Sequence, residues 1–356
     1  MEGVPAGLHI YKSSIDSELK RRMVGYGRGK RMQIEADKVE ILSGVRKNMT
    51  IGSPIAMMIA NRDQSIDSLP VILDPRPGHA DLAGILKYDL KDVRSVLERA
   101  SARETVGRVS AGAVAKMLLG EFGIRVMSHV IMIGGIEARL RGLGFNQIVT
   151  LAEKSDLRCA DHKAAERMKE EIDEAARSGD TLGGIFEVIA KGVPPGLGSY
   201  SQWDKRMDAN LARAIMSVQA VKGVSFGMGF KMAERKGSIV HDEIFYDGKR
   251  GFYRKTNNAG GIEGGITNGE DVVIHAVMKP IATLKKPLAS ANIRTKRSAK
   301  ATVERADVCA VPAAGVVAES MAALEIANAM VEKFGGDSLV EMMRNYEGYL
   351  KQIKEI

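Results

Sequence analysis

The stretch from Arg76 to Arg108 most constrains what this chain can fold into, because it combines a Pro-Gly turn, a basic cluster and a helix start. Arginine and hydroxyl side chains gather within ten residues of it: Arg99, Ser101, Arg103, Thr105 and Arg108. Apolar residues then recur at intervals of three and four over 106–118, which predicts an amphipathic helix. Ser101 stands where an N-cap is expected, and Glu104 is expected to complete a capping box with it.

The arginines around this helix start point to an anion-binding site. A helix start carries unpaired backbone N–H groups and a partial positive charge, and guanidinium groups add further donors and charge. A phosphate or another anion would fit such a place. The alternative is a charged helix end that is only solvated, and the residues alone do not separate the two.

Composition narrows the class of protein. The chain of 356 residues is 45% apolar and 27% charged, which is typical of a soluble protein with an ample core. No run reaches the ~18 consecutive apolar residues that span a bilayer, and the first residues lack the pattern of a signal peptide, so we expect no membrane partner. Only two cysteines occur, Cys159 and Cys309, which fits a cytoplasmic location better than a disulfide scaffold.

The charge of the chain favours anionic partners. The formal net charge is +8 and the sequence pI is near 9.3, which suits nucleic acid or small phosphorylated ligands. Aromatic residues make up only 5% of the chain, and they are not interleaved with the basic clusters as base-stacking surfaces usually require. We therefore expect small anions rather than nucleic acid.

A second basic cluster surrounds Gly25, Gly27 and Gly29. Its cations are Arg21, Arg22, Arg28, Lys30 and Arg31. Glycine lets the backbone bend sharply, so these side chains can converge on one anion, although a solvated basic loop is the alternative. A further glycine-rich run, 257–266, would allow a close approach of the backbone to a ligand, but hairpin turns look the same.

The predicted elements indicate an α+β fold in a single compact domain, residues 1–356. Strands are expected over 38–61 as a paired set and at 124–138, 183–198 and 272–280. Helices are expected from a Ser13 or Ser14 cap, over 161–178 and over 211–221, with two more after an apolar stretch that ends at Ala318. Strands and helices do not alternate regularly, which disfavours a parallel sheet.

The histidines give no support for a metal site, because none of the six pairs with another at ligand spacing. His129 and His275 lie in apolar strands and are expected to be hydrogen-bonded core residues. His79 differs, because it follows Pro77-Gly78 in a polar turn, and it is a candidate functional residue. No nucleophile elbow or P-loop occurs, which argues against a serine hydrolase or an ATP-driven enzyme.

Several long motifs are spread over nearly the whole chain. They include RRMVGYGRGKRM, RPGHADLAGILKY, LERASARETVGRVSAGAVAK, NNAGGIEGGITNG and ERADVCAVPAAGVVAESM. These residues resemble the chorismate synthase family. The resemblance implies a lyase that uses reduced FMN to convert 5-enolpyruvylshikimate 3-phosphate to chorismate by 1,4-trans elimination of phosphate, the last step of the shikimate pathway. It also implies a homotetramer whose subunits pack helices between antiparallel β-sheets.

The resemblance also implies roles for particular residues. His79 matches a histidine near the flavin, and Asp307 matches a carboxylate near flavin N5; both are implied to handle protons. The positions implied to bind the substrate, or NADPH, are Arg22, Arg28, Arg31 and Arg103. The positions implied to bind FMN are Arg99, Ala100, Ser101, Gln219, Ala220, Gly264, Lys279, Pro280, Ile281, Ala282, Thr283 and Arg305.

The sequence departs from the family pattern in two places. The family begins with a strand and a Gly-[Glu/Asp]-Ser-His-Gly motif whose histidine is implied to protonate the departing phosphate, and this sequence starts just after that motif. A truncated, catalytically incompetent flavin- or anion-binding protein of the same fold is therefore the alternative to an active lyase. Ala306 stands where the family usually has Ser or His. The resemblance leaves open whether NADPH or an external reductant reduces the flavin.

Overall fold

A five-stranded antiparallel sheet lies at the centre of the fold, with the strand order β6–β5–β7–β13–β8. The structure is a computed structural model that describes residues 1–29, 37–61, 68–140, 142–248 and 251–356. The five strands are β5 (Arg125–Ile133), β6 (Ile136–Glu137), β7 (Gly184–Lys191), β8 (Val221–Phe226) and β13 (Val272–Met278). Along β13 every second side chain is buried, because successive side chains of a strand point to opposite faces and one face lies in the core.

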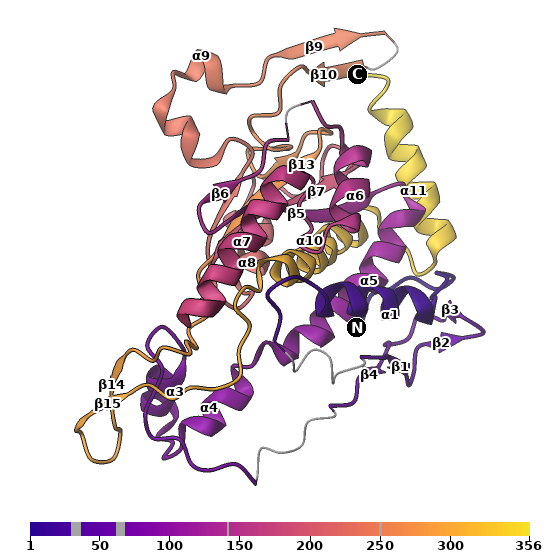
Figure 1. The fold of residues 1–356 in the computed structure, drawn as a ribbon. Coiled ribbons are helices and arrows are strands. Elements are labelled where there is room, and N and C mark those ends of the chain that lie inside the picture. The colour runs from indigo at the N-terminus through magenta and orange to yellow at the C-terminus, as the bar shows by residue number, and fades with distance from the viewer. Residues whose placement is uncertain (30–36, 62–67, 141, 249–250) are drawn as a thin grey trace.

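A layer of helices covers one face of this sheet. The helices are α1 (Lys12–Met23), α5 (Thr105–Glu121) and α10 (Val311–Phe334), and α10 crosses β5 and β7. Figure 1 shows this layer between the sheet and four short N-terminal strands: β1 (Glu40–Ile41), β2 (Val45–Arg46), β3 (Met49–Thr50) and β4 (Met57–Met58). Gly112 lets α5 approach α10 closely, because a Cβ there would lie 2.3 Å from the Cβ of Ser320. The expected α+β class is confirmed.

The helix α10 is the core helix of the protein. Its length and apolar composition would suffice to cross a membrane, but 67% of its most apolar window is buried inside the protein. The apolar residues up to Ala318 were expected to precede the C-terminal helices, and this expectation is wrong, because α10 starts at Val311 with Pro312 in its first turn. Nearly every side chain in the first half of this helix is apolar and buried, so the sequence there has no polar face from which a helical period could be read.

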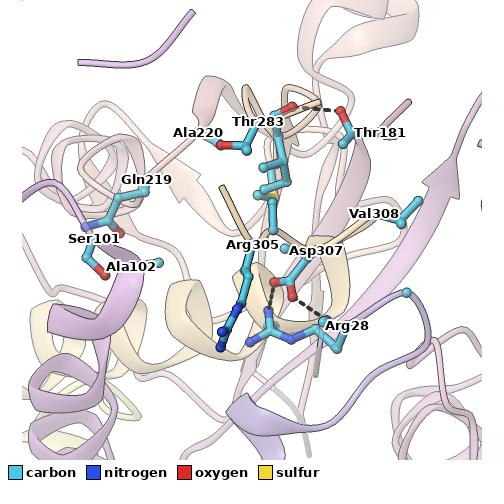
Figure 2. Close-up of a pocket in the computed structure, with 18 of the residues that line it drawn as sticks. Arg28, Ser101, Ala102, Thr181, Gln219, Ala220, Thr283, Arg305, Asp307 and Val308 are labelled. Carbon is cyan, nitrogen blue, oxygen red and sulfur yellow. Dashed lines mark hydrogen bonds and ion pairs between the residues drawn. The ribbon is translucent and has the colours of Figure 1, made fainter. Parts of the chain in front are cut away.

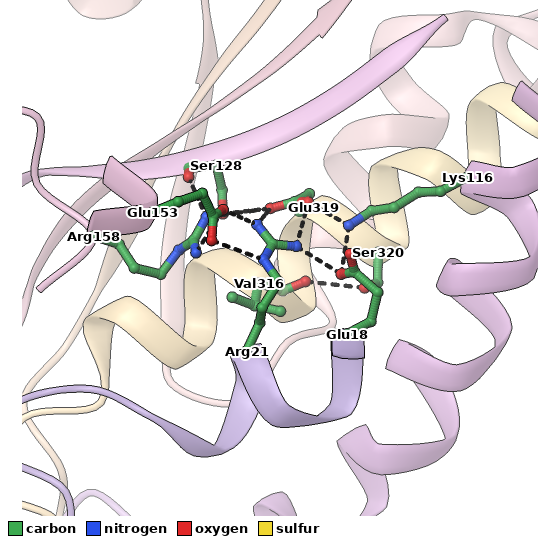
Figure 3. Close-up of polar contacts among 9 residues, drawn as sticks. All are labelled: Glu18, Arg21, Lys116, Ser128, Glu153, Arg158, Val316, Glu319 and Ser320. Atoms are coloured by element: carbon green, nitrogen blue, oxygen red, sulfur yellow. Dashed lines mark hydrogen bonds and ion pairs between the residues drawn. The ribbon is translucent and has the colours of Figure 1, made fainter. Parts of the chain in front are cut away.

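A buried ion-pair cluster ties α10 to its neighbours (Figure 3). The carboxylate of Glu319, whose side chain is 2% exposed, lies 2.9 Å from Nη1 of Arg21 on α1 and also contacts Lys116 on α5. Ser128 on β5 donates a hydrogen bond of 2.9 Å to it. Burial alone would raise the pKa of Glu319, but Lys116 and Arg21 outweigh it and hold that pKa well below its ordinary value. The cluster therefore joins helix to helix and helix to sheet.

A smaller unit, residues 69–99 with the hairpin 289–300, projects from one end of the molecule (Figure 1). It contains α3 (Asp81–Tyr88), α4 (Val93–Arg99), β14 (Ala289–Ala291) and β15 (Ser298–Lys300). Its own small core consists of Ile72, Ile85, Val93 and Val96, and Ile293 of the hairpin packs against them. This arrangement brings the Pro77-Gly78 turn next to the end of β13.

The remaining elements surround this frame. They are α6 (Phe145–Lys154), α7 (His162–Ser178), α8 (Met207–Met216), α9 (Gly237–Val240), α11 (Leu339–Gln352), β9 (Ile244–Asp247), β10 (Gly251–Arg254), β11 (Ile262–Glu263) and β12 (Ile266–Thr267). The helix expected at 161–178 is confirmed, with Asp161 as its N-cap. The Ser13 or Ser14 cap is wrong, because α1 starts at Lys12 and its N-cap Tyr11 makes no side-chain bond.

Two histidines of the sheet take the structural role expected for them. Nε2 of His129 lies 2.8 Å from one carboxylate oxygen of Glu187, and Nε2 of His275 lies 2.7 Å from the other. All three residues face each other across β5, β7 and β13. Burial would raise the pKa of Glu187, but these two imidazoles lower it to about 2.

Candidate functional site

The main candidate site is a pocket of about 990 Å³ at the sheet edge, beside the start of α10. Its walls come from six segments distant in the sequence: 22–29, 101–105, 176–181, 218–220, 278–285 and 303–317. Its volume is at the upper end of the ~300–1,000 Å³ typical of small-molecule sites. Among the lining side chains, cations outnumber acids, so the pocket suits an anion.

Two of the arginines in the pocket share one carboxylate. Asp37 lies 3.0 Å from Nη2 of Arg22 and 2.5 Å from Nη1 of Arg103. Arg22 also donates to the hydroxyl of Thr105, at 3.2 Å. Burial lowers the pKa of the Arg22 guanidinium, and the pair with Asp37 offsets part of that effect. Asp37 thus fixes both guanidinium groups in the wall before any ligand arrives.

A second ion pair joins the glycine loop to the segment before α10. Asp307 lies 2.9 Å from Nη1 of Arg28 and accepts a hydrogen bond of 2.6 Å from the backbone N–H of Gly29 (Figure 2). Gly27 permits this approach: its φ is +86°, and a Cβ there would lie 3.1 Å from the Cβ of Cys309. The glycines therefore bring Arg28 into the pocket, whereas Arg21, expected in the same basic cluster, pairs with Glu319 instead.

Arg305 is a lining cation that is free to meet a ligand. In Figure 2 its side chain runs beside Arg28 and Asp307, and within the described ranges no carboxylate lies at ion-pair distance from it. An unpaired guanidinium in a pocket is a ready partner for a phosphate or carboxylate.

Gln219 presents an unpaired acceptor to the same pocket. Its side-chain amide nitrogen donates to the carboxylate of Glu104, and because a carboxylate only accepts, the amide orientation is fixed. Oε1 of Gln219 is left buried without a partner among the described residues. A buried acceptor without a donor is costly, so this atom is placed to accept from a ligand N–H or O–H group.

The helix start at Ser101 differs from its expected form. Ser101 accepts a hydrogen bond from the backbone N–H of Arg103, at 3.2 Å, and caps a single 3-10 turn. Glu104 does not complete the capping box. Its carboxylate binds Gln219 and, at 3.1 Å, Nε of Arg108. One distant partner, Gln219, and one partner a helical turn away, Arg108, therefore replace the bond of the capping box.

The Pro77-Gly78 turn lies beside this pocket without lining it. Nζ of Lys279 donates to the backbone carbonyl of Gly78, at 2.9 Å. Nη1 of Arg76 donates at 2.7 Å to the hydroxyl of Thr283, which does line the pocket. Nδ1 of His79 lies 2.5 Å from Asp81, which is fully buried. The turn is thus coupled to the pocket wall through two side chains.

Comparison with known proteins decides the family. The family model described as "Chorismate synthase" matches residues 1–331. The chain belongs to the chorismate synthase family. It is 56% identical to the chorismate synthase of Geobacter sulfurreducens and 53% identical to that of Symbiobacterium thermophilum, in each case over 99% of this chain and 95% of the relative. A crystal structure of chorismate synthase superimposes with a TM-score of 0.83 at 43% identity, covering 100% of this chain and 94% of that one.

The structure gathers many of the residues that the family resemblance implied. Those that line the pocket are Arg22, Arg28, Arg103, Ser101, Gln219, Ala220, Ile281, Thr283, Arg305 and Asp307. Those that do not line it are His79, Arg99, Ala100, Gly264, Lys279, Pro280 and Ala282. Arg31 lies outside the described residues. Ala306, the departure from the family pattern, also lines the pocket.

Sequence reasoning missed the acidic residues that hold these cations and amides. Asp37 stands in no motif and is 15 residues from Arg22, so nothing local indicates the pair. Glu104 was assigned to a cap because its local spacing fitted one. No group of three or more His, Cys, Asp or Glu is arranged to hold a metal ion in the part of the chain that the structure describes.

Proposed function

We propose that this pocket is the active site in which the chain carries out its family's reaction. The chain is a carbon–oxygen lyase that converts 5-enolpyruvylshikimate 3-phosphate to chorismate and phosphate. The observation that carries the assignment of the site is the unpaired Arg305 beside the Arg28–Asp307 pair. The substrate has a phosphate and two carboxylates, and such a polyanion needs converging guanidinium groups with an adjacent proton-handling carboxylate.

The residues present fit reduced FMN, the cofactor that the family uses. Gln219 Oε1 is a buried acceptor without a partner in the described structure, and the flavin ring offers N–H donors. Arg305 offers donors for anionic groups. When bound, reduced FMN supplies electron density that assists cleavage of the C–O bond to phosphate, with no net redox change.

The chain's own residues bind anions, orient them and hold protons. Arg22 and Arg103, fixed by Asp37, and Arg28, fixed by Asp307, present N–H donors to the phosphate and carboxylates of the substrate. We assign the carboxylate of Asp307 the transfer of the ring proton, because it lies in the pocket wall as an acceptor that is already positioned by Gly29. We assign His79 a second proton-handling role from the adjoining turn.

The remaining family positions are part of the same proposal. They are Arg31, Arg99, Ala100, Gly264, Lys279, Pro280 and Ala282. We further propose a homotetramer, which light scattering of the purified protein would test, and a cytoplasmic location, which two free, buried cysteines support. NADPH as reductant of the flavin stays a proposal, tested by following NADPH oxidation with FMN and purified protein.

Titration of FMN with and without 5-enolpyruvylshikimate 3-phosphate tests the shared pocket. FMN should bind more tightly when the substrate is present, because each ligand completes the other's site. Arg305→Ala should weaken FMN or substrate binding. Arg213→Ala, in which the replaced side chain is 73% exposed and outside the pocket, should not. Equal affinities with and without substrate, or equal effects of the two substitutions, would contradict the proposal.

A further inference from the structure

The Pro77-Gly78 turn carries a hydrogen-bonded network whose geometry constrains the protonation of His79. Its centre consists of Arg76, His79 and Asp81. Asp81 is the first residue of α3. Asp81 is fully buried, with its side chain 1% exposed, whereas the His79 side chain is 24% exposed. The imidazole therefore stands between a buried carboxylate and the open side of the turn.

Arg76 holds the Asp81 carboxylate in one orientation. The backbone N–H and Nε of Arg76 donate to Oδ2 of Asp81, at 3.0 and 2.8 Å. Nη2 of Arg76 donates to Oδ1, at 3.0 Å. Burial alone would raise the pKa of Asp81, but the bonds from His79 and Arg76 hold that pKa well below its ordinary range. Asp81 is thus an anion with fixed oxygen positions.

The contact with Asp81 selects one tautomer of His79. Nδ1 of His79 lies 2.5 Å from Oδ1 of Asp81 and 3.0 Å from Nη2 of Arg76. If Nδ1 carries the proton, it donates to the carboxylate, and two donors face each other only at the longer distance, to Arg76. If Nδ1 carries a lone pair, two acceptors meet at the shorter distance, which is unfavourable. The proton therefore belongs on Nδ1, and Nε2 is left as the basic atom.

We propose that Asp81 is a positioning residue that holds the neutral His79 in its Nδ1–H tautomer, so that Nε2 is available to accept and return a proton during the reaction. This inference rests on the proposed role of His79 at the site. Arg76 extends the same arrangement to the pocket, because its Nη1 binds Thr283 in the pocket wall, at 2.7 Å. The turn, the carboxylate and the wall then act as one rigid support for the imidazole.

Asp81→Asn should reverse the tautomer. The asparagine oxygen is expected in the place of Oδ2, where it keeps the bonds from the backbone and Nε of Arg76. The amide NH2 group then takes the place of Oδ1 and donates to Nδ1 of His79. There the NH2 group faces one donor, Nη2 of Arg76, whereas the opposite orientation would set it against two, the backbone N–H and Nε of Arg76. His79 would therefore carry its proton on Nε2, the wrong atom for a base, as an Asp-to-Asn change does in the serine-protease triad.

The test reads the imidazole directly, in protein with ¹⁵N-labelled histidine and without substrate or flavin, at a pH where His79 is neutral. Wild type should give the ¹⁵N shifts of the Nδ1–H tautomer and Asp81→Asn those of the Nε2–H tautomer. Turnover of Asp81→Asn should fall by at least ~10²-fold. Asp92→Asn is the matched control, because Asp92 caps α4 in the same unit and asparagine caps equally well.

Each possible outcome supports or overturns the proposal. An Nε2–H tautomer in wild type overturns the proposal, and this result needs no variant to fold. Turnover of Asp81→Asn within ~3-fold of the Asp92→Asn control also overturns it. Failure of the wild-type protein to form chorismate would overturn the proposed function instead, and the tautomer measurement distinguishes the two because it uses no ligand.

Discussion

Arg28→Ala should weaken substrate binding while leaving the fold intact. The Arg28 side chain is 11% exposed and forms an ion pair with Asp307, at 2.9 Å. A hydrogen bond to a charged group contributes ~1.5–3 kcal/mol, so the KM for 5-enolpyruvylshikimate 3-phosphate should rise roughly 10- to 150-fold. The substitution leaves Asp307 the bond from Gly29, at 2.6 Å, so we expect a stability loss of only about 1 kcal/mol.

Steady-state kinetics under anaerobic conditions, with saturating reduced FMN, measure this effect. Arg213→Ala removes an exposed arginine outside the pocket and serves as the control. A double-mutant cycle of Arg28→Ala with Asp307→Asn adds a second readout, because two residues in contact should show an interaction free energy of at least ~0.5 kcal/mol. An unchanged KM in Arg28→Ala, with the protein folded, would show that Arg28 is only a structural partner of Asp307.

Three further predictions follow from contacts in the described structure. Asp307→Asn should lower turnover by at least ~10²-fold with FMN still bound; near-normal turnover would remove Asp307 from the mechanism. Glu319→Gln should destabilise the protein by up to about 3–5 kcal/mol, because Arg21 and Lys116 lose their buried carboxylate and keep only the more exposed Glu18 and Glu153; an unchanged melting temperature would refute this. Because the folded-state pKa of Glu187 is lowered to about 2, its contribution to stability is present above its unfolded pKa of ~4.3 and is lost as the pH falls towards 2. Glu187→Gln should therefore lose less stability over that range in acid denaturation, and an equal loss would contradict the assignment.

Sequence patterns predicted the helices and strands whose local signal is clear. They did not predict elements and contacts in which tertiary packing overrides the local signal. The strand β13 was predicted correctly because it is a short apolar run rich in valine and isoleucine, and the helix α7 because one of its faces is polar. The start of α10 was missed because its first turns consist almost entirely of Ala and Val, so no polar face reveals the helical period. Local rules assigned Glu104 to a capping box, but its carboxylate binds Gln219 instead, a residue 115 positions away.

The candidate site could be predicted in its arginines but not in their partners. The family resemblance predicted Arg22, Arg28 and Arg305 as binding residues, and all three line the pocket. The pairing of Arg28 with Asp307 spans most of the chain, and Asp37 meets Arg22 only after folding. Such contacts leave no periodic trace in a single sequence, because they depend on where distant segments come together.

Anaerobic product analysis of the wild-type protein tests the central claim most directly. The protein would be incubated with 5-enolpyruvylshikimate 3-phosphate and reduced FMN, and chorismate, phosphate and reduced flavin would be measured together. We expect chorismate and phosphate in equal amounts, many turnovers per protein, and no net consumption of reduced flavin. Release of neither product, or oxidation of one flavin for each chorismate formed, would contradict the account.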